Sequence, residues 1–169
     1  MNARPSIDEL KEFLRLAPLP EEGGLYSEVH RSAESVGRAG LPERFTGDRR
    51  LCTDIYYLLP GNGKSLLHRI KGEELWHFLM GDPFTLVEIA AGGAVKKTVM
   101  GQNLRAGEKL IHAVRAGAWF GCYPGEGGEY SLVSCTVAPG FEFEDFELGN
   151  RDELLKAFPH AEIEILKLT

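Results

Sequence analysis

The sequence contains little cysteine and no long apolar run, and each of these absences excludes a class of protein. The three cysteines, Cys52, Cys122 and Cys135, form no CxxC or CxxH pair, so neither a disulfide framework nor a zinc knot is indicated. We expect them to be reduced, and most of them to be buried. No run of about 18 apolar residues could span a membrane, and the N-terminus lacks the apolar core of a secretion signal. A cytoplasmic protein is therefore expected.

The sequence also has fewer basic than acidic side chains. The chain has 19 Lys and Arg against 25 Asp and Glu, for a formal net charge of -6. Because phosphate backbones are bound by clustered Lys and Arg, this balance argues against a nucleic-acid partner. The 169 residues, 43% of them hydrophobic, are enough for one core and favour a single domain over residues 1–169.

Short β-strands dominate the middle of the chain. Eight segments of strand-like composition are separated by glycine or proline turns: residues 52–59, 65–70, 74–80, 84–90, 94–100, 108–114, 118–123 and 130–137. An alternating stretch at residues 25–30 precedes them. Strands at this spacing, with no helical pattern among them, predict an all-β antiparallel sandwich or barrel, with a barrel core of about residues 25–148.

Both ends of the chain carry helical signals. Ser6 and Glu9 have the spacing of a capping box, and apolar residues at helical spacing follow up to Pro18, which predicts an opening helix. Residues 150–153 resemble the start of a short helix that ends at Pro159. The alternation over residues 161–168 predicts a final strand. The polar segment 31–50 is either a mobile flap over a pocket or an ordinary surface loop.

The candidate functional stretch runs from Ser65 to Asp82. If residues 74–80 form a strand, Glu74 lies on one face with Trp76 and Phe78, and His77 lies on the other. A hairpin at Gly72 would then bring His68 opposite Glu74. A His and a Glu that meet on an apolar face form a polar pair whose proton affinities shift easily. This pair is the predicted polar centre of the site.

At these residues the sequence resembles the cupin superfamily. The first cupin motif has the form G, five residues, H-x-H, three or four residues, E, six residues, G, which His68, Glu74 and Gly81 match. Ile70 replaces the second histidine. The second motif resembles residues 115–120, where Phe120 replaces another histidine. Two of the four usual metal ligands are therefore apolar.

The strings IYYLLPGNGKSLLHRIKGEELWHFLMGDP, AGAWFG and SCTVAPGFEFEDFELG resemble one particular single-domain cupin family of unknown function, over roughly residues 6 to 160. The resemblance implies a cupin-type double-stranded β-helix, a jelly-roll barrel with a helix near each end. It also implies a homodimer and a pocket reminiscent of the dTDP-sugar 3,5-epimerases. By that analogy His68 is a base, Glu74 is its partner, and either Tyr56 or Tyr57 is an acid. Adjacent residues on a strand face opposite ways, so only one tyrosine can face the interior.

Four aromatic residues are candidate ligand-binding residues, since pockets often pair aromatic walls with a few polar groups: Trp76, Phe78, Trp119 and Phe120. A divalent metal would need His68, Glu74 and a third ligand, and His77 could supply it only if a bulge turned it inward.

Three functions remain open at this point. The first is isomerase- or epimerase-like proton transfer on a carbohydrate-like or keto substrate. The second is a non-catalytic module that binds or senses a small metabolite. The third is a metal-dependent oxygenase or isomerase.

Overall fold

The computed structural model describes residues 4–169. The opening helix, α1 (Ile7–Leu14), has both halves of the predicted capping box. The Ser6 hydroxyl accepts from the Glu9 amide, and the Glu9 carboxylate accepts from the Ser6 amide. Two short helices, α2 (Arg151–Ala157) and α3 (Glu162–Leu168), close the described chain. None of the helices within residues 4–169 is long and apolar enough to cross a membrane.

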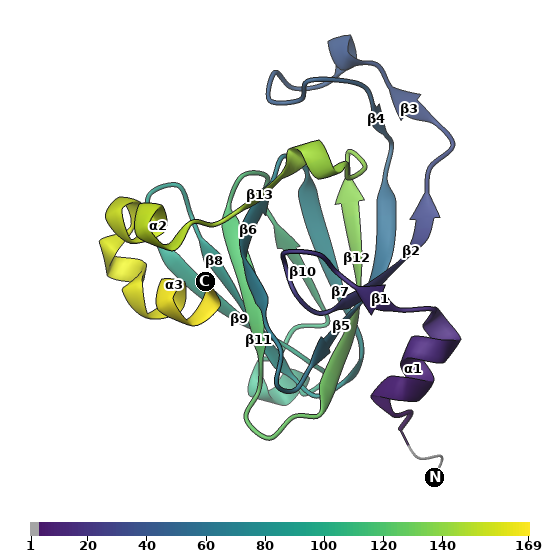
Figure 1. Cartoon of the computed structure of the whole chain (residues 1–169), viewed down its shortest axis with the longest axis vertical. Helices are drawn as coiled ribbons and strands as arrows, with labels where there is room; N and C mark the ends of the chain where they lie inside the picture. Colours follow the sequence, from purple (N-terminus) through teal and green to yellow (C-terminus); the bar gives the residue numbers. More distant parts are fainter. Residues whose placement is uncertain (1–3) are drawn as a thin grey trace.

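Between α1 and α2 the chain is built almost entirely from strands (Figure 1). Their bounds are β1 (Ala17–Pro18), β2 (Leu25–Arg31), β3 (Ser35–Val36), β4 (Arg49–Arg50), β5 (Thr53–Pro60), β6 (Ser65–Ile70), β7 (Glu73–Gly81), β8 (Phe84–Ile89), β9 (Val95–Met100), β10 (Ile111–Val114), β11 (Trp119–Pro124), β12 (Tyr130–Ala138) and β13 (Phe146–Leu148). Every predicted strand from residue 25 to residue 137 is present.

The strands form two main antiparallel sheets that face one another. The six-stranded sheet has the order β1-β2-β5-β12-β7-β10, and the five-stranded sheet has the order β13-β6-β11-β8-β9. Side chains on the two inner faces make the core, in which Trp76, Phe84 and Phe120 lie close together. This arrangement confirms the predicted all-β jelly roll.

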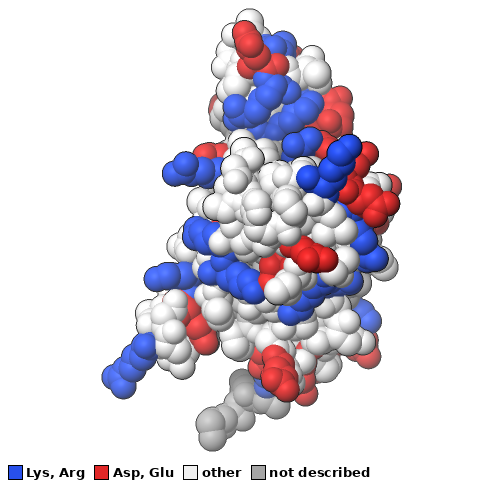
Figure 2. All heavy atoms as spheres, turned by 90° about the vertical axis from the view of Figure 1, so that its left-hand side faces the viewer, with Lys and Arg blue, Asp and Glu red and all other residues white. Residues whose placement is uncertain are grey.

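Helices cover parts of both outer faces. α1 packs through Leu10 on Leu58 and Leu132 of the six-stranded sheet. α2 and α3 pack on the five-stranded sheet, where Trp119 contributes to the same apolar cluster. Figure 2 shows the side of the molecule that carries α2 and α3, and acidic and basic side chains are interspersed over it.

The predicted final strand is wrong, because residues 162–168 form α3. Alternation places Ile163 and Ile165 on one side, yet Ile163 is 78% exposed and Ile165 is buried. Ala161, Ile165 and Leu168 are all buried and share the helical spacing of one face. That spacing lets this face pack on the barrel beside Trp119, which a strand at the same place could not do with the same three residues.

Residues 31–50 form an arm that projects from one end of the barrel (Figure 1). A small two-stranded sheet, β3 with β4, stiffens the arm. Its base is fixed by Arg49, whose guanidinium binds both carboxylate oxygens of Asp145 at 2.6 and 2.7 Å in a fully buried pair. Arg44 also donates to the carbonyl of Lys71. The arm is therefore an ordered element joined to the segment that precedes β13.

Candidate functional site

A cavity of about 640 Å³ lies between the two sheets. Its walls come from the turn between β1 and β2, from the inner faces of β2, β5, β6, β7 and β12, and from the segment that leads into β13. Acidic, imidazole and thiol side chains meet inside it: Glu22, His68, Glu74 and Cys135. Aromatic side chains also line it: Tyr26, Phe141, Phe143 and Phe146. A volume of this size is typical of small-molecule sites.

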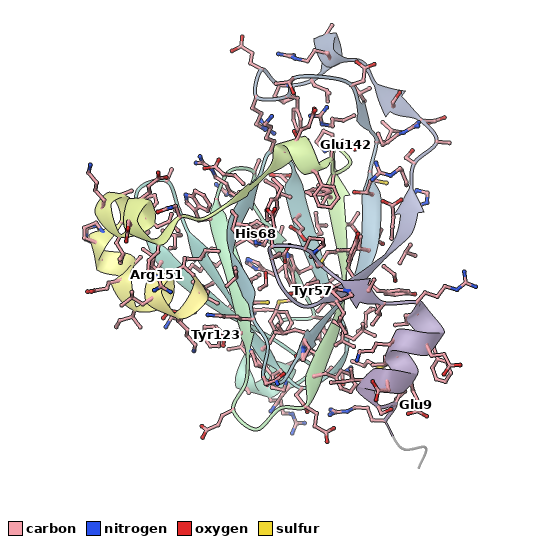
Figure 3. All side chains as sticks on the ribbon, in the orientation of Figure 1. Glu9, Tyr57, His68, Tyr123, Glu142 and Arg151 are labelled. Atoms are coloured by element: carbon pink, nitrogen blue, oxygen red, sulfur yellow. The ribbon has the colours of Figure 1, made fainter. Side chains whose placement is uncertain are left out.

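His68 is buried and held in one orientation. Its Nδ1 lies 2.8 Å from the carbonyl oxygen of Leu66. Because a carbonyl can only accept, Nδ1 carries the hydrogen, and in the neutral imidazole Nε2 then has a free lone pair. The ring packs against Phe120, with centroids 4.1 Å apart, and stacks on Phe146 at 5.3 Å. Figure 3 labels His68 in the interior of the barrel. These contacts fix an imidazole that can accept a proton at Nε2.

Glu22 is the carboxylate nearest to this histidine. Its Oε2 lies 3.8 Å from Nε2 of His68, and its Oε1 accepts a hydrogen bond of 2.7 Å from the Ser65 hydroxyl. The backbone carbonyl of Glu22 also accepts from the amide of Leu66. Three links therefore join the β1–β2 turn to β6, and they place a negative charge where it stabilises a protonated imidazole.

Tyr57 supports the turn that carries Glu22. Its hydroxyl donates to the carbonyl of Gly23. Gly24 has φ +75, and a Cβ at this position would lie 2.4 Å from the Tyr57 hydroxyl oxygen, so only glycine lets the turn pack this closely on the ring. Burial raises the pKa of Tyr57 well above its usual value. Tyr57 faces the interior, whereas Tyr56 packs on the outer face with the α1 cluster; neither lines the cavity.

Glu74 projects into the cavity from β7. Burial raises the pKa of its carboxyl to about 8, and the nearby charge of Glu22 acts in the same direction. A hydrogen bond with the Cys135 thiol opposes the shift. The carboxyl is therefore largely protonated at neutral pH and can donate a proton. Burial also raises the pKa of Cys135, which keeps its thiol neutral.

The structure corrects how His68 and Glu74 come together. The predicted hairpin does not form, because β6 belongs to the five-stranded sheet and β7 to the six-stranded sheet. The two side chains reach the same cavity from opposite walls. The carboxylate within 4 Å of His68 is Glu22 rather than Glu74. Glu22 was missed because its turn has no strand or helix pattern that indicates where a side chain points.

The predicted aromatic ligand-binding residues lie elsewhere. Trp76, Phe78 and Phe120 fill the core between the sheets without lining the cavity, and within the described chain the indole nitrogen of Trp76 has no hydrogen-bond partner. Trp119 lies on the outer face, where the Arg69 guanidinium stacks on it at 4.6 Å. Alternation along the strands explains all four positions.

The residues of the cavity do not fit a metal ion. In residues 4–169 no group of three or more His, Cys, Asp or Glu side chains is arranged to hold one. Ile70 contributes an apolar wall, and Phe120 packs on the His68 ring. His77 does not supply a further ligand, because its neighbours on β7, Trp76 and Phe78, face the core and His77 therefore faces away from the cavity.

The fold and this cavity define a small-molecule-binding barrel of the cupin type. Residues 8–149 match the model of the family described as Cupin superfamily (DUF985). The chain belongs to this family. No protein of curated function matches the sequence.

Two solved structures are similar over nearly the whole chain. A hypothetical protein from Leishmania major is 32% identical, with a TM-score of 0.87, over 98% of this chain and 99% of that one. A protein from Shewanella oneidensis is 34% identical, with a TM-score of 0.86, over 98% of each chain. A cupin 2 domain-containing protein from Halorhodospira halophila shares the fold at 14% identity and a TM-score of 0.54, over 87% of this chain and 83% of that one.

Proposed function

We propose that the protein catalyses isomerase- or epimerase-like proton transfer on a keto compound, including carbohydrate-like ones, in this cavity. One observation carries the proposal: an imidazole with a free Nε2 and a carboxyl with a pKa of about 8 line the same cavity from opposite walls. Proton transfer next to a carbonyl needs a base for the carbon and an acid for the oxygen. The free Nε2 of His68 can serve as the base, and the protonated carboxyl of Glu74 can serve as the acid.

Nε2 of His68 removes a proton from the carbon next to the carbonyl, and the C–H electron pair forms the carbon–carbon double bond of an enol. The carbonyl oxygen takes the proton of Glu74. The carboxylate of Glu22 stabilises the imidazolium that has formed, from 3.8 Å. For the epimer, water gives a proton to the other face of the carbon, the enol oxygen returns its proton to Glu74, and the imidazolium of His68 releases its proton to water. For the isomer of a hydroxy ketone, the imidazolium of His68 gives its proton to the former carbonyl carbon, and the hydroxyl on the neighbouring carbon gives its proton to Glu74 as it becomes the new carbonyl.

Glu74 takes the role that the family analogy gives to a tyrosine. The Tyr57 hydroxyl already donates to Gly23, and Tyr56 lies on the outer face. A carboxyl that keeps its proton at neutral pH supports assigning the acid to Glu74.

The experiment is solvent exchange. We expect deuterium from D₂O to enter the carbon next to the carbonyl of keto sugars and 2-oxo acids, measured by NMR against the rate without protein. His68→Gln and Glu74→Gln should lower the rate at least about 100-fold, which is the usual contribution of a general acid or base. His77→Gln, a histidine outside the cavity, should leave it unchanged. Exchange that survives His68→Gln in a folded protein would reject the base.

A non-catalytic module that binds or senses a metabolite is the second candidate, because the cavity alone supports binding. Ligands would then raise the melting temperature without any exchange. A metal-dependent oxygenase or isomerase is the third, and it requires a bound metal as well as turnover.

We also propose that the protein is a homodimer in the cytoplasm. Exposed apolar side chains gather on β7, on β10 and just before β10: Leu79, Met80, Leu110 and Ile111. β10 is an edge strand of the six-stranded sheet, and such edges readily pair with a second copy. Light scattering should give twice the monomer mass, and Ile111→Glu should lower it. Cys52, Cys122 and Cys135 are free, which suits a reducing compartment.

A further inference from the structure

The mouth of the cavity carries an aromatic residue whose exposure folding does not explain. Phe143 is 62% exposed and lines the cavity. Its ring stands edge-on to that of Phe141, with centroids 5.2 Å apart. The alternation of Phe and acidic residues over 141–146 suggests that these rings cover apolar surface, and Phe141 and Phe146 do pack against the core. Phe143 instead presents its ring to the opening.

The segment that holds this ring is fixed by buried charges. Phe143 begins the 3-10 turn Phe143–Asp145. Asp145 is bound by the buried Arg49 and by Lys71 at 3.3 Å, and Arg49 also binds Glu144 at 2.5 Å. On the other side, Arg31 donates to Glu142 at 2.7 Å, a residue at the upper end of the barrel in Figure 3. The exposed ring therefore belongs to an ordered part of the chain.

The size of the cavity shows that a ligand can reach from the polar groups to the mouth. At about 30 Å³ for each water molecule, a volume of about 640 Å³ has room for up to about 20 waters, which is enough for a keto compound that also carries a ring. His68 and Glu74 lie on the inner walls, and most of the exposed wall area is apolar. The lining also includes charged side chains, among them Arg31, which binds Glu142 beside Phe143.

We infer that the substrate carries a flat aromatic ring, which stacks on Phe143 and Phe141 at the mouth while its keto group reaches Glu74 and His68. This inference rests on the proposed function for the keto group and adds the class of the remote group. An aromatic ring gains from an edge-on or offset contact with another ring, which a saturated ring of similar size cannot make in full.

The test compares three probes: 2-oxo-4-phenylbutanoate, its cyclohexyl counterpart, and 2-oxobutanoate, which has no ring. Dissociation constants are measured by NMR titration for the parent, for Phe143→Leu and for Phe13→Leu. Phe13 is a matched control, because it is 67% exposed on α1 and does not line the cavity. Leucine keeps an apolar side chain at position 143 and removes only the ring.

We expect the phenyl probe to bind at least threefold more tightly than the cyclohexyl probe. Phe143→Leu should raise the dissociation constant of the phenyl probe by about three- to tenfold and that of the cyclohexyl probe by less than twofold. Phe13→Leu should change neither constant. Equal affinities for the two rings, no effect of Phe143→Leu, or no binding of either probe would overturn the inference. So would a change of oligomeric mass in Phe143→Leu, because the ring would then lie in an interface.

Deuterium exchange on the same samples separates this inference from the proposed function. Ring-dependent binding without exchange at C3 supports the aromatic subsite and contradicts the chemistry. Exchange at equal rates for 2-oxobutanoate and the phenyl probe, without ring-dependent binding, supports the chemistry and contradicts the subsite.

Discussion

Replacing Glu74 with glutamine should make the protein more stable at neutral and alkaline pH. The carboxyl has a pKa of about 8 in the fold, against 4.5 for an unperturbed glutamate. Between these values the unfolded chain has lost the proton and the folded chain still holds it. Because the folded state binds more protons, this group lowers the free energy of unfolding as pH rises, by about 1.4 kcal/mol per pH unit. Its effect is absent below pH 4.5 and complete above pH 8.

The magnitude follows from the same two values. The difference of 3.5 units between 8 and 4.5 corresponds to about 5 kcal/mol above pH 8, and the 2.5 units between 4.5 and pH 7 correspond to about 3 kcal/mol. Water in the cavity would solvate part of the charge, so both figures are upper bounds. Glutamine has nearly the shape of the protonated carboxyl and does not ionise.

The assay is urea denaturation of the parent and of Glu74→Gln at pH 5, 7 and 8.5. The stability of the variant minus that of the parent should be small at pH 5 and should rise by up to about 3 kcal/mol at pH 7. Taking the difference removes the titration of groups that do not interact with Glu74. Glu73→Gln is the control, because Glu73 is the exposed neighbour on the same strand, and its difference should stay flat. A flat difference for Glu74→Gln, or one that falls with pH, would show that this carboxyl ionises normally.

Three further predictions concern the arm, the first helix and metal content. Arg49→Met should cost about 3–5 kcal/mol in urea denaturation, because it leaves the buried Asp145 without its main partner, while Arg50→Met, at an exposed neighbour, should cost much less; equal costs would contradict this reading. Ser6→Ala should cost about 1 kcal/mol, because it removes the side-chain cap of α1, and an unchanged denaturation midpoint would show that the cap contributes nothing. Protein purified without chelator should carry well below one equivalent of iron, zinc, manganese or nickel by elemental analysis, and a value near one would favour the metal-dependent function.

The strands could be predicted because each one carries its own signal. Side chains on β7 alternate between Glu74, Trp76 and Phe78 inside and Leu75 and His77 outside, and this period depends only on local geometry. The secondary structure near the C-terminal end was harder to predict. Residues 161–168 fit both a short strand and a helix, and only packing against the barrel decides between them.

Strand pairing could not be read from the same signals. The short connection at Lys71 and Gly72 has the length of a hairpin, yet it carries the chain from one sheet to the other. Both outcomes turn His68 and Glu74 inward, so the alternation is identical in the two cases. Pairing depends instead on residues far along the chain, since β6 pairs with β11 and β13.

The cavity is better explained by a ligand than by the stability of the fold. Glu74 lowers stability at pH 7 by up to about 3 kcal/mol, a large part of the 5–15 kcal/mol that keeps a typical domain folded. An apolar residue at this position would avoid that loss and could fill some of the space. The nearby charge of Glu22 adds to this loss, because it further raises the pKa of Glu74. The proposed proton transfer, in contrast, uses the protonated Glu74 as its acid and the charge of Glu22 beside the imidazole of His68.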